Sequence, residues 1–253
     1  MGFGRLAQSI ERLSMKEHCA LAAVVRQENC ASDELPSLPG FDLVRPVPLR
    51  LLGKEEINTL PLCRYEGAVT IVNSASGLDE AMERLEGETL LGFDTETRPV
   101  FKKGPTNPPA LLQLSAPDCT FLFQLRSLSL PRPLLKLLSR PDVTKTGLGI
   151  RDDVRGLQRL ASFEPGGFVD VAELAGRLGL LNAGLRSLAA TLLGVRISKM
   201  AQCSNWEMER LKVQQIVYAA TDAWISREIH LHLSQMLRTT SSESASRSSL
   251  SRV

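Results

Sequence analysis

The sequence has little of what marks several common classes of protein. Its 253 residues include five scattered cysteines, with no C-x-x-C pair, and three histidines. An odd number of unpaired cysteines does not indicate a disulfide scaffold, and it favours a reduced, cytoplasmic location. The shortage of histidines and paired cysteines also argues against a zinc site.

Long apolar runs and a strong net charge are missing as well. The longest early apolar run covers residues 19–25, which is too short for a membrane span and short for a signal peptide. We therefore expect no membrane association. The formal net charge is only +2, so any nucleic-acid-binding surface must be local. Hydrophobic residues make up 43% and charged residues 23%, the balance of a soluble globular protein.

The composition changes near both ends of the chain and predicts one domain between two extensions. Residues 1–28 have roughly helical apolar spacing, and the proline-rich residues that follow do not sustain regular structure. We expect residues 1–64 to form a helical and irregular extension. Residues 239–253 contain seven serines and almost nothing to bury, which predicts a disordered tail. The domain itself is expected over residues 65–238.

Strand and helix patterns alternate inside this domain. Strands are predicted at 68–72, 90–95, 110–115, 120–125, 143–148 and 168–169. Helices are predicted at 76–86, 133–138, 151–161, after Asp170, at 185–193, and from Ser204 or Asn205 through Leu237. Ser76 and Asp79 are placed as a capping box for the first of these helices. The order predicts a mixed sheet with helices on both faces, antiparallel at one side and parallel at the other.

Asp94 and Glu96 end the apolar strand that begins at Leu90. Side chains alternate along a strand, so these two carboxylates point to the same face. Two carboxylates that lose their hydration together repel each other, and a divalent cation such as Mg²⁺ or Mn²⁺ relieves the repulsion. The alternative is a strand end that simply reaches solvent, because the D-x-E pattern is common.

Tyr218 and Asp222 are separated by four positions on a predicted helix, so they share a face. Apolar neighbours indicate that the helix is largely buried, and a buried aspartate needs a partner or a metal ion. The alternative is a hydrogen bond between the two side chains inside the core.

A third acidic pair, Asp152 and Asp153, opens a helix directly after the glycine turn of residues 147–149. Acidic residues at a helix start interact favourably with the helix dipole, so both residues have a plain capping interpretation. Taken together, however, a strand, a helix start and a helix each deliver acidic groups. Acidic groups from several separate segments are what a two-metal site requires.

At this point the sequence resembles the DnaQ-like (DEDD) superfamily of 3′-5′ exonucleases. Its three motifs match residues 93–97 (FDTET), 147–153 (GLGIRDD) and 218–223 (YAATDA). The Tyr-x-x-x-Asp form is similar to the tyrosine subclass, which includes ribonuclease D and the Werner-syndrome-helicase-type exonuclease domain. The histidine subclass would need histidine where this chain has Val217. Supporting matches occur at residues 110–114, 184–189 and 202–206, and the similarity covers roughly residues 66–235.

The resemblance implies an α/β, RNase H-like fold with a mixed five-stranded sheet flanked by helices. It implies hydrolysis of phosphodiester bonds from the free 3′ end of RNA or DNA by two divalent ions, Mg²⁺ or Mn²⁺, with release of nucleoside 5′-monophosphates. Asp94, Glu96, Asp153 and Asp222 would hold the metal ions, with Asp153 acting through water. Tyr218 would position the attacking water, since a tyrosine with a pKa of about 10 is a poor base.

Four further residues are candidate substrate contacts, namely Thr95, Lys102, Lys103 and Trp206. The two lysines lie in a loop rich in proline and glycine, where they contact phosphates or are solvated. Trp206 either stacks on a base or, as we prefer, packs at the start of the last helix. The competing function is a catalytically silent nucleic-acid-binding module of the same fold. The choice between RNA and DNA and the oligomeric state stay open.

Overall fold

The computed structural model describes residues 50–100 and 107–250, with side chains up to residue 240. The predicted helix of residues 1–28 and the two lysines Lys102 and Lys103 lie outside the described residues. The division into an extension, a domain and a tail stays a prediction.

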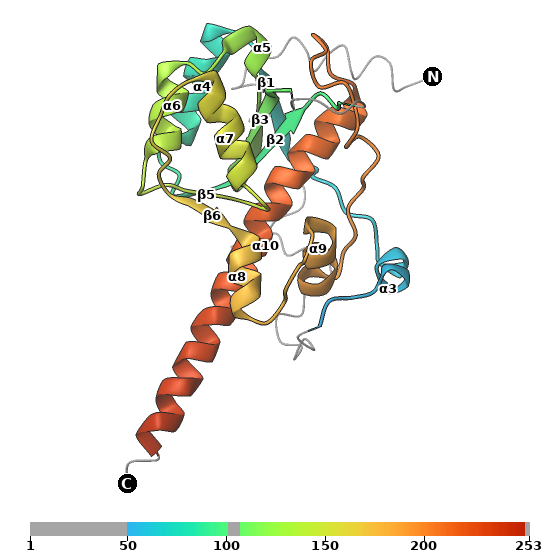
Figure 1. The fold of residues 1–253 in the computed structure, drawn as a ribbon, viewed down its shortest axis with the longest axis vertical. Helices are drawn as coiled ribbons and strands as arrows, with labels where there is room; N and C mark the ends of the chain where they lie inside the picture. The colour runs from blue at the N-terminus through green and yellow to red at the C-terminus, as the bar shows by residue number, and fades with distance from the viewer. Residues whose placement is uncertain (1–49, 101–106, 251–253) are drawn as a thin grey trace, which may run out of the picture.

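A six-stranded mixed sheet forms the centre of the protein (Figure 1), with the strand order β1-β4-β3-β2-β5-β6. The strands are β1 (Ala68–Val72), β2 (Leu90–Thr97), β3 (Pro109–Ser115), β4 (Cys119–Gln124), β5 (Thr144–Gly147) and β6 (Phe168–Asp170). The strands β2, β3 and β4 are antiparallel neighbours. Parallel pairs lie on both sides of them, because β1 pairs with β4 while β5 and β6 continue from β2.

Two expectations about the sheet need correction. The family resemblance predicts five strands, whereas the structure has a sixth, β6, paired with β5. Gly167 explains the close approach of β6: its φ is +66°, and a Cβ there would lie 2.2 Å from the carbonyl oxygen of Val143. Parallel pairing is also found at both edges rather than one, since β1 lies outside the β2–β4 meander and pairs with β4.

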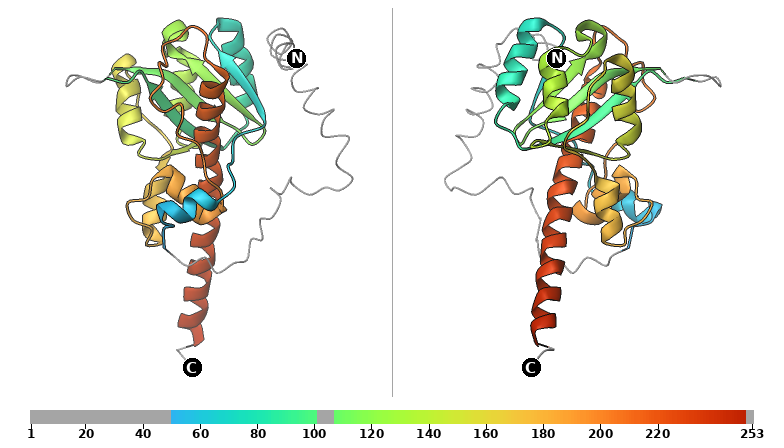
Figure 2. Two further views of the ribbon diagram at one scale, coloured as in Figure 1. Left: turned by 90° about the vertical axis from the view of Figure 1, so that its right-hand side faces the viewer. Right: turned by 60° about the vertical axis from the view of Figure 1, so that its left-hand side comes forward.

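Helices cover both faces of the sheet, as predicted. They are α3 (Lys54–Thr59), α4 (Ala75–Leu85), α5 (Leu125–Leu128), α6 (Arg132–Ser139), α7 (Arg151–Leu160), α8 (Val171–Arg177), α9 (Leu185–Leu193) and α10 (Val213–Leu250). The helices α4, α6 and α7 pack on one face, and α10 packs on the other. The two views of Figure 2 show α10 crossing the sheet and continuing past α8 and α9.

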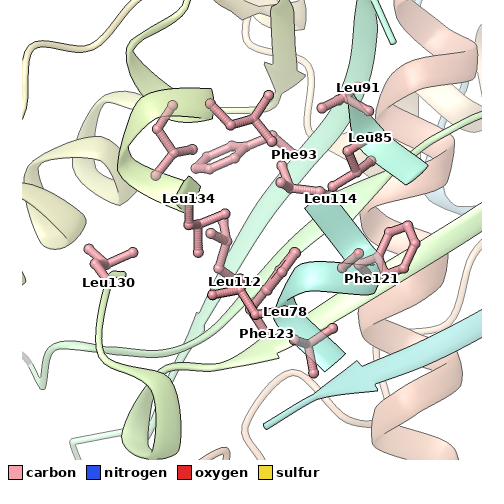
Figure 3. Packing of buried hydrophobic residues seen from close by; sticks show 14 of the residues in the cluster. Leu78, Leu85, Leu91, Phe93, Leu112, Leu114, Phe121, Phe123, Leu130 and Leu134 are labelled. Carbon is pink, nitrogen blue, oxygen red and sulfur yellow. The ribbon is translucent and has the colours of Figure 1, made fainter. Parts of the chain in front are cut away.

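The core follows from the alternation of side chains along the three central strands. Leu91 and Phe93 of β2 point to the face covered by α4, α6 and α7, where the Phe93 ring meets the Phe168 ring edge-on at 5.2 Å. The neighbouring strands contribute Leu112, Leu114, Phe121 and Phe123 to the same cluster (Figure 3). Most of this face is apolar, and the two carboxylates of β2, Asp94 and Glu96, point to the face of α10.

Two helix starts differ from the prediction. The cap of α4 is Ser74, whose Oγ accepts from the backbone N–H of Gly77, so Ser76 lies inside the helix. The last helix begins at Val213, because the polar groups near residue 205 cap short turns instead. At its far end α10 extends to Leu250, into the range for which the sequence predicts disorder. None of the described helices is both long and apolar enough to span a membrane.

Candidate active site

The acidic residues meet where β2 passes under α10. Gly92 allows this contact, since a Cβ at that position would lie 1.9 Å from the carbonyl oxygen of Ala223. Asp94 and Glu96 follow Gly92 on the same face of the strand, at alternate positions. The helix in turn places Asp222 beside them, and its alanines Ala219 and Ala223 are fully buried. Small residues on both elements therefore bring the carboxylates together.

Asp94, Glu96 and Asp222 form one carboxylate cluster. Each offers a carboxylate oxygen, and these oxygens all lie within 4.8 Å of one another. Glu96 and Asp222 are only 8% and 7% exposed, while Asp94 opens partly to solvent. Asp222 Oδ1 is buried without a hydrogen-bond partner. Buried carboxylates with so few donors around them call for a cation, and a set of oxygen ligands suits a hard divalent ion.

The negative charges of this carboxylate cluster repel one another. Burial raises the pKa of Asp94 well above its usual range, and the charges of Asp222 and Asp153 raise it further. Burial and the charge of Asp94 raise the pKa of Glu96 to about 10. Burial raises the pKa of Asp222 to about 7, against the opposing effects of Tyr218 and Lys199. The protein without a cation therefore keeps protons on this site near neutral pH.

Asp153 lies beside the cluster and is held by a separate contact. Thr95 Oγ1 donates a short hydrogen bond to Asp153 Oδ1, which links β2 to the first turn of α7. Burial raises the pKa of Asp153, and the bond from Thr95 lowers it. Its neighbour Asp152 is turned to solvent and faces Arg155, with 92% of its side chain exposed. Asp153 lies outside the carboxylate cluster itself, but its charge, unlike that of Asp152, raises the pKa values of Asp94 and Glu96.

Tyr218 lies one helical turn before Asp222 and lines the same pocket. Burial and the charge of Asp222 raise the pKa of Tyr218 above its ordinary value. Its hydroxyl therefore keeps its proton at neutral pH. The ring packs beside that of Trp206, with 6.0 Å between the centroids. A neutral phenol in this position can orient a water molecule by hydrogen bonding.

The predicted substrate contacts fall in different places. Thr95 lines the pocket and also holds Asp153. Trp206 is 1% exposed and packs in an apolar cluster with Leu111, Leu122 and Ala219, which is the packing role that the sequence analysis preferred.

The pocket has a second wall that sequence reasoning largely missed. Its volume is about 660 Å³, and the carboxylates and Tyr218 form one part of its lining. The other part comes from α3, α9 and the loop before residue 202, and it includes Lys54, Arg186 and Lys199. No pattern in the sequence marks Lys54. Arg186 lies inside the supporting motif at residues 184–189, which was the only available signal for it.

Similar folds occur among solved structures. The exonuclease domain of Nibbler from Aedes aegypti superposes with a TM-score of 0.63 at 24% sequence identity, over 70% of this chain and 91% of that domain. Ribonuclease D from Escherichia coli superposes with a TM-score of 0.61 at 22% identity, over 69% of this chain and 46% of that protein. These likenesses support the RNase H-like exonuclease fold.

Sequence comparison gives relatives and a family. The human exonuclease 3′-5′ domain-containing protein 2 is 37% identical over 244 residues, which are 90% of this chain and 38% of that protein. The mouse bifunctional 3′-5′ exonuclease/ATP-dependent helicase WRN is 30% identical over 71% of this chain and 14% of that protein. The chain thus spans well under half of these relatives. The family model described as 3′-5′ exonuclease matches residues 69–238. With that match and the acidic cluster at the end of β2, the chain belongs to the family of 3′-5′ exonuclease domains.

Proposed function

We propose that this chain removes nucleotides one at a time from the 3′ end of a nucleic acid and releases nucleoside 5′-monophosphates. One observation carries the proposal. Asp94, Glu96 and Asp222 gather within 4.8 Å in a pocket that Tyr218 also lines, in a chain of the 3′-5′ exonuclease family. The function needs a site that binds metal cations and phosphate anions together. This pocket is lined by acidic residues on one side and basic residues on the other.

We infer that the site takes two divalent ions, Mg²⁺ or Mn²⁺. The donor set consists of carboxylate oxygens, and Asp222 Oδ1 has no other partner. When bound, such ions activate a water molecule and stabilise the charge that develops on the scissile phosphate and the leaving oxygen. Asp94, Glu96 and Asp222 would hold them, and Asp153 would assist from the position that Thr95 secures.

The protein's own groups then orient the reactants. The Tyr218 hydroxyl, whose proton is retained because burial raises its pKa, hydrogen-bonds the attacking water and fixes its direction. It does not remove a proton from that water. The apolar walls of the pocket, among them Leu148, Leu185 and Ile197, exclude bulk water from the reacting end of the strand.

A digestion assay tests the function. Single- and double-stranded RNA and DNA, labelled at the 5′ end, are incubated with Mg²⁺, Mn²⁺ or chelator. We expect a ladder that shortens one nucleotide at a time from the 3′ end, no shortening with chelator, and 5′-monophosphates as products. In Asp94→Asn the ladder should disappear while the circular dichroism spectrum is unchanged. Blocking the 3′ end without slowing degradation would contradict the proposal.

The same assay separates the enzyme from a silent binding module of this fold. A module would bind the labelled strands and shorten none of them with either metal ion. The cytoplasmic location expected from the cysteine pattern is a separate proposal, and microscopy of a fluorescently tagged chain in cells would test it.

A further inference from the structure

We propose that Lys54 of α3 and Arg186 of α9, with Lys199 beside them, form a subsite for the backbone phosphates of a single strand upstream of the scissile bond. This cationic wall lines the same pocket as the carboxylates. The inference rests on the proposed exonuclease function and adds a specificity-determining element to it. Lys54 lies outside residues 69–238, the part of the chain that matches the family.

The segment that carries Lys54 is fastened to the domain by its backbone. The N–H of Leu52 donates to Thr191 Oγ1 of α9 at 3.1 Å, and Arg196 Nε donates to the carbonyl of Leu60 at 2.9 Å. The N–H of Cys63 donates to the carbonyl of Arg196 at 2.8 Å. These bonds lie on both sides of α3, so the helix is held in place as a wall of the pocket without any contribution from the Lys54 ammonium group.

No cation of this wall is held in an ion pair within the part of the chain that the structure describes, although the charge of Lys199 lowers the pKa of Asp222. Arg50, on the same segment as Lys54, is by contrast bound to Glu56 by two hydrogen bonds of 3.0 and 2.7 Å. A cation that lines a pocket and lacks a counter-charge is available to an anionic ligand.

Arg186 is oriented toward this role by a neighbour from α3. Its Nη2 donates to Asn58 Oδ1 at 2.7 Å. The Nε group is buried and has no hydrogen-bond partner in the structure, so the two terminal nitrogens are the donors that can meet a ligand. A phosphate accepts the fork of a guanidinium particularly well, because two parallel N–H groups match two of its oxygens.

The two walls of the pocket carry charges of opposite sign, and this indicates the class of ligand. The acidic side holds phosphates only through bound cations, whereas the basic side attracts them directly. A strand that places its scissile phosphate at the carboxylates would reach Lys54 and Arg186 with its next phosphates. The pocket volume of about 660 Å³ is that of a small-ligand site, which is room for the end of one strand.

Binding measured without metal ions tests the subsite apart from catalysis. A fluorescent single-stranded oligonucleotide is titrated with wild-type protein in chelator, and its anisotropy is followed over salt concentrations. We expect Lys54→Ala to weaken binding about tenfold, the size of one charge-assisted hydrogen bond. The slope of log affinity against log salt should fall by about 0.7 for the lost phosphate contact. Lys54→Glu should weaken binding further.

Lys136→Ala is the matched control, because Lys136 is an exposed lysine on α6, on the other face of the sheet. It removes the same charge and should leave both the affinity and the salt slope unchanged. Equal losses in Lys54→Ala and Lys136→Ala would show a general effect of net charge and overturn the subsite.

A chemical change in the strand identifies the phosphate. One linkage at a time is replaced by an uncharged methylphosphonate, and each strand is measured with wild type and Lys54→Ala. At the linkage that Lys54 contacts, the two losses should not add, because either change already removes the contact. Additive losses at every linkage would overturn the proposal.

Hydrolysis distinguishes a failed subsite from a failed function. With Mg²⁺, Lys54→Ala should raise KM for a single strand and leave kcat unchanged. Normal hydrolysis and binding by Lys54→Ala would refute the subsite and leave the exonuclease proposal standing. A wild-type protein that shortens no strand would refute the proposed function itself, whatever the binding results.

Discussion

The two faces of strand β2 differ in polarity and in their effect on stability. Leu91 and Phe93 point into an apolar cluster, and both are fully buried. Gly92, Asp94 and Glu96 alternate with them and face α10. The first face contributes stability through burial of apolar area. The second face gathers carboxylates whose pKa values are raised by burial, so it works against the stability of the cation-free protein.

This difference shows how one strand can serve both folding and function. Since side chains alternate, a single residue step separates a core position from a position in the carboxylate cluster. The apolar face and the contact with α10 hold the backbone, and the carboxylates are then confined to one place. Variants on the two faces should consequently fail in different ways.

Glu96→Gln should have the largest effect on activity. It removes a cation ligand from the carboxylate cluster, and we expect kcat/KM to fall by roughly 10³-fold or more, about 4 kcal/mol. The free energy of unfolding without metal ions should rise. Burial raises the pKa of Glu96 to about 10, so at pH 7 the folded protein keeps a proton there that the unfolded chain releases, and glutamine removes this cost. Chemical denaturation in chelator measures this, and a large loss of stability would contradict the division between the two faces.

Phe93→Ala should fail in the opposite way. The lost ring leaves a cavity beside Phe168, and we expect the free energy of unfolding to fall by about 3–5 kcal/mol. At a temperature where the variant is still folded, kcat per folded molecule should stay near the wild-type value. Urea denaturation and kinetics on the same preparation check both statements. A lost kcat with unchanged stability would break the comparison.

Gly92→Ala should damage both properties. The new Cβ would meet the backbone carbonyl oxygen of Ala223 at 1.9 Å, and a backbone atom cannot turn away as a side chain does. The helix α10 must shift, at a cost of about 1–3 kcal/mol for overpacking. Because Asp222 moves with it, kcat should also fall. Gly87→Ala is the control, since its Cβ would meet nothing within 4 Å. Full activity in Gly92→Ala would show that the cluster tolerates displacement of the helix.

Tyr218→Phe tests the orienting hydroxyl. The ring and its packing beside Trp206 are retained, so the melting temperature should be unchanged. We expect kcat to fall about 10- to 100-fold, or roughly 1.4–2.7 kcal/mol, with little change in KM. Single-turnover kinetics would measure it. A kcat equal to that of the wild type would remove Tyr218 from the reaction.

The pH dependence of the stabilisation by divalent ions tests the buried charges directly. The unfolded pKa of aspartate is about 3.9, whereas burial raises that of Asp222 in the fold to about 7. The contribution of Asp222 to stability is therefore present below pH 4 and is lost as the pH rises through 7. Bound cations offset this loss, so the gain in stability on adding Mg²⁺ should increase from pH 5 to 7, by about 1.4 kcal/mol per pH unit for the proton displaced from Asp222. A gain that is the same at every pH would contradict the raised pKa.

Local patterns predicted most of the fold. Apolar runs with turn residues between them located β2, β3 and β4, which are buried or half-buried over most of their length. The strand count of five came from the resemblance and was wrong by one. The starts of α4 and α10 were misplaced because several polar residues near each start can act as caps, and only the packed structure selects one.

The sequence by itself singled out the acidic residues that the structure gathers into one cluster. The spacing of Asp94 and Glu96 and of Tyr218 and Asp222 follows from strand and helix periods, and these periods are local properties of the chain. The tertiary structure alone decided what surrounds them. The raised pKa values depend on how deeply the carboxylates are buried against α10, and the wall of Lys54 and Arg186 joins segments more than a hundred residues apart. Such contacts between distant segments leave no period in the sequence, so no local pattern could have shown them.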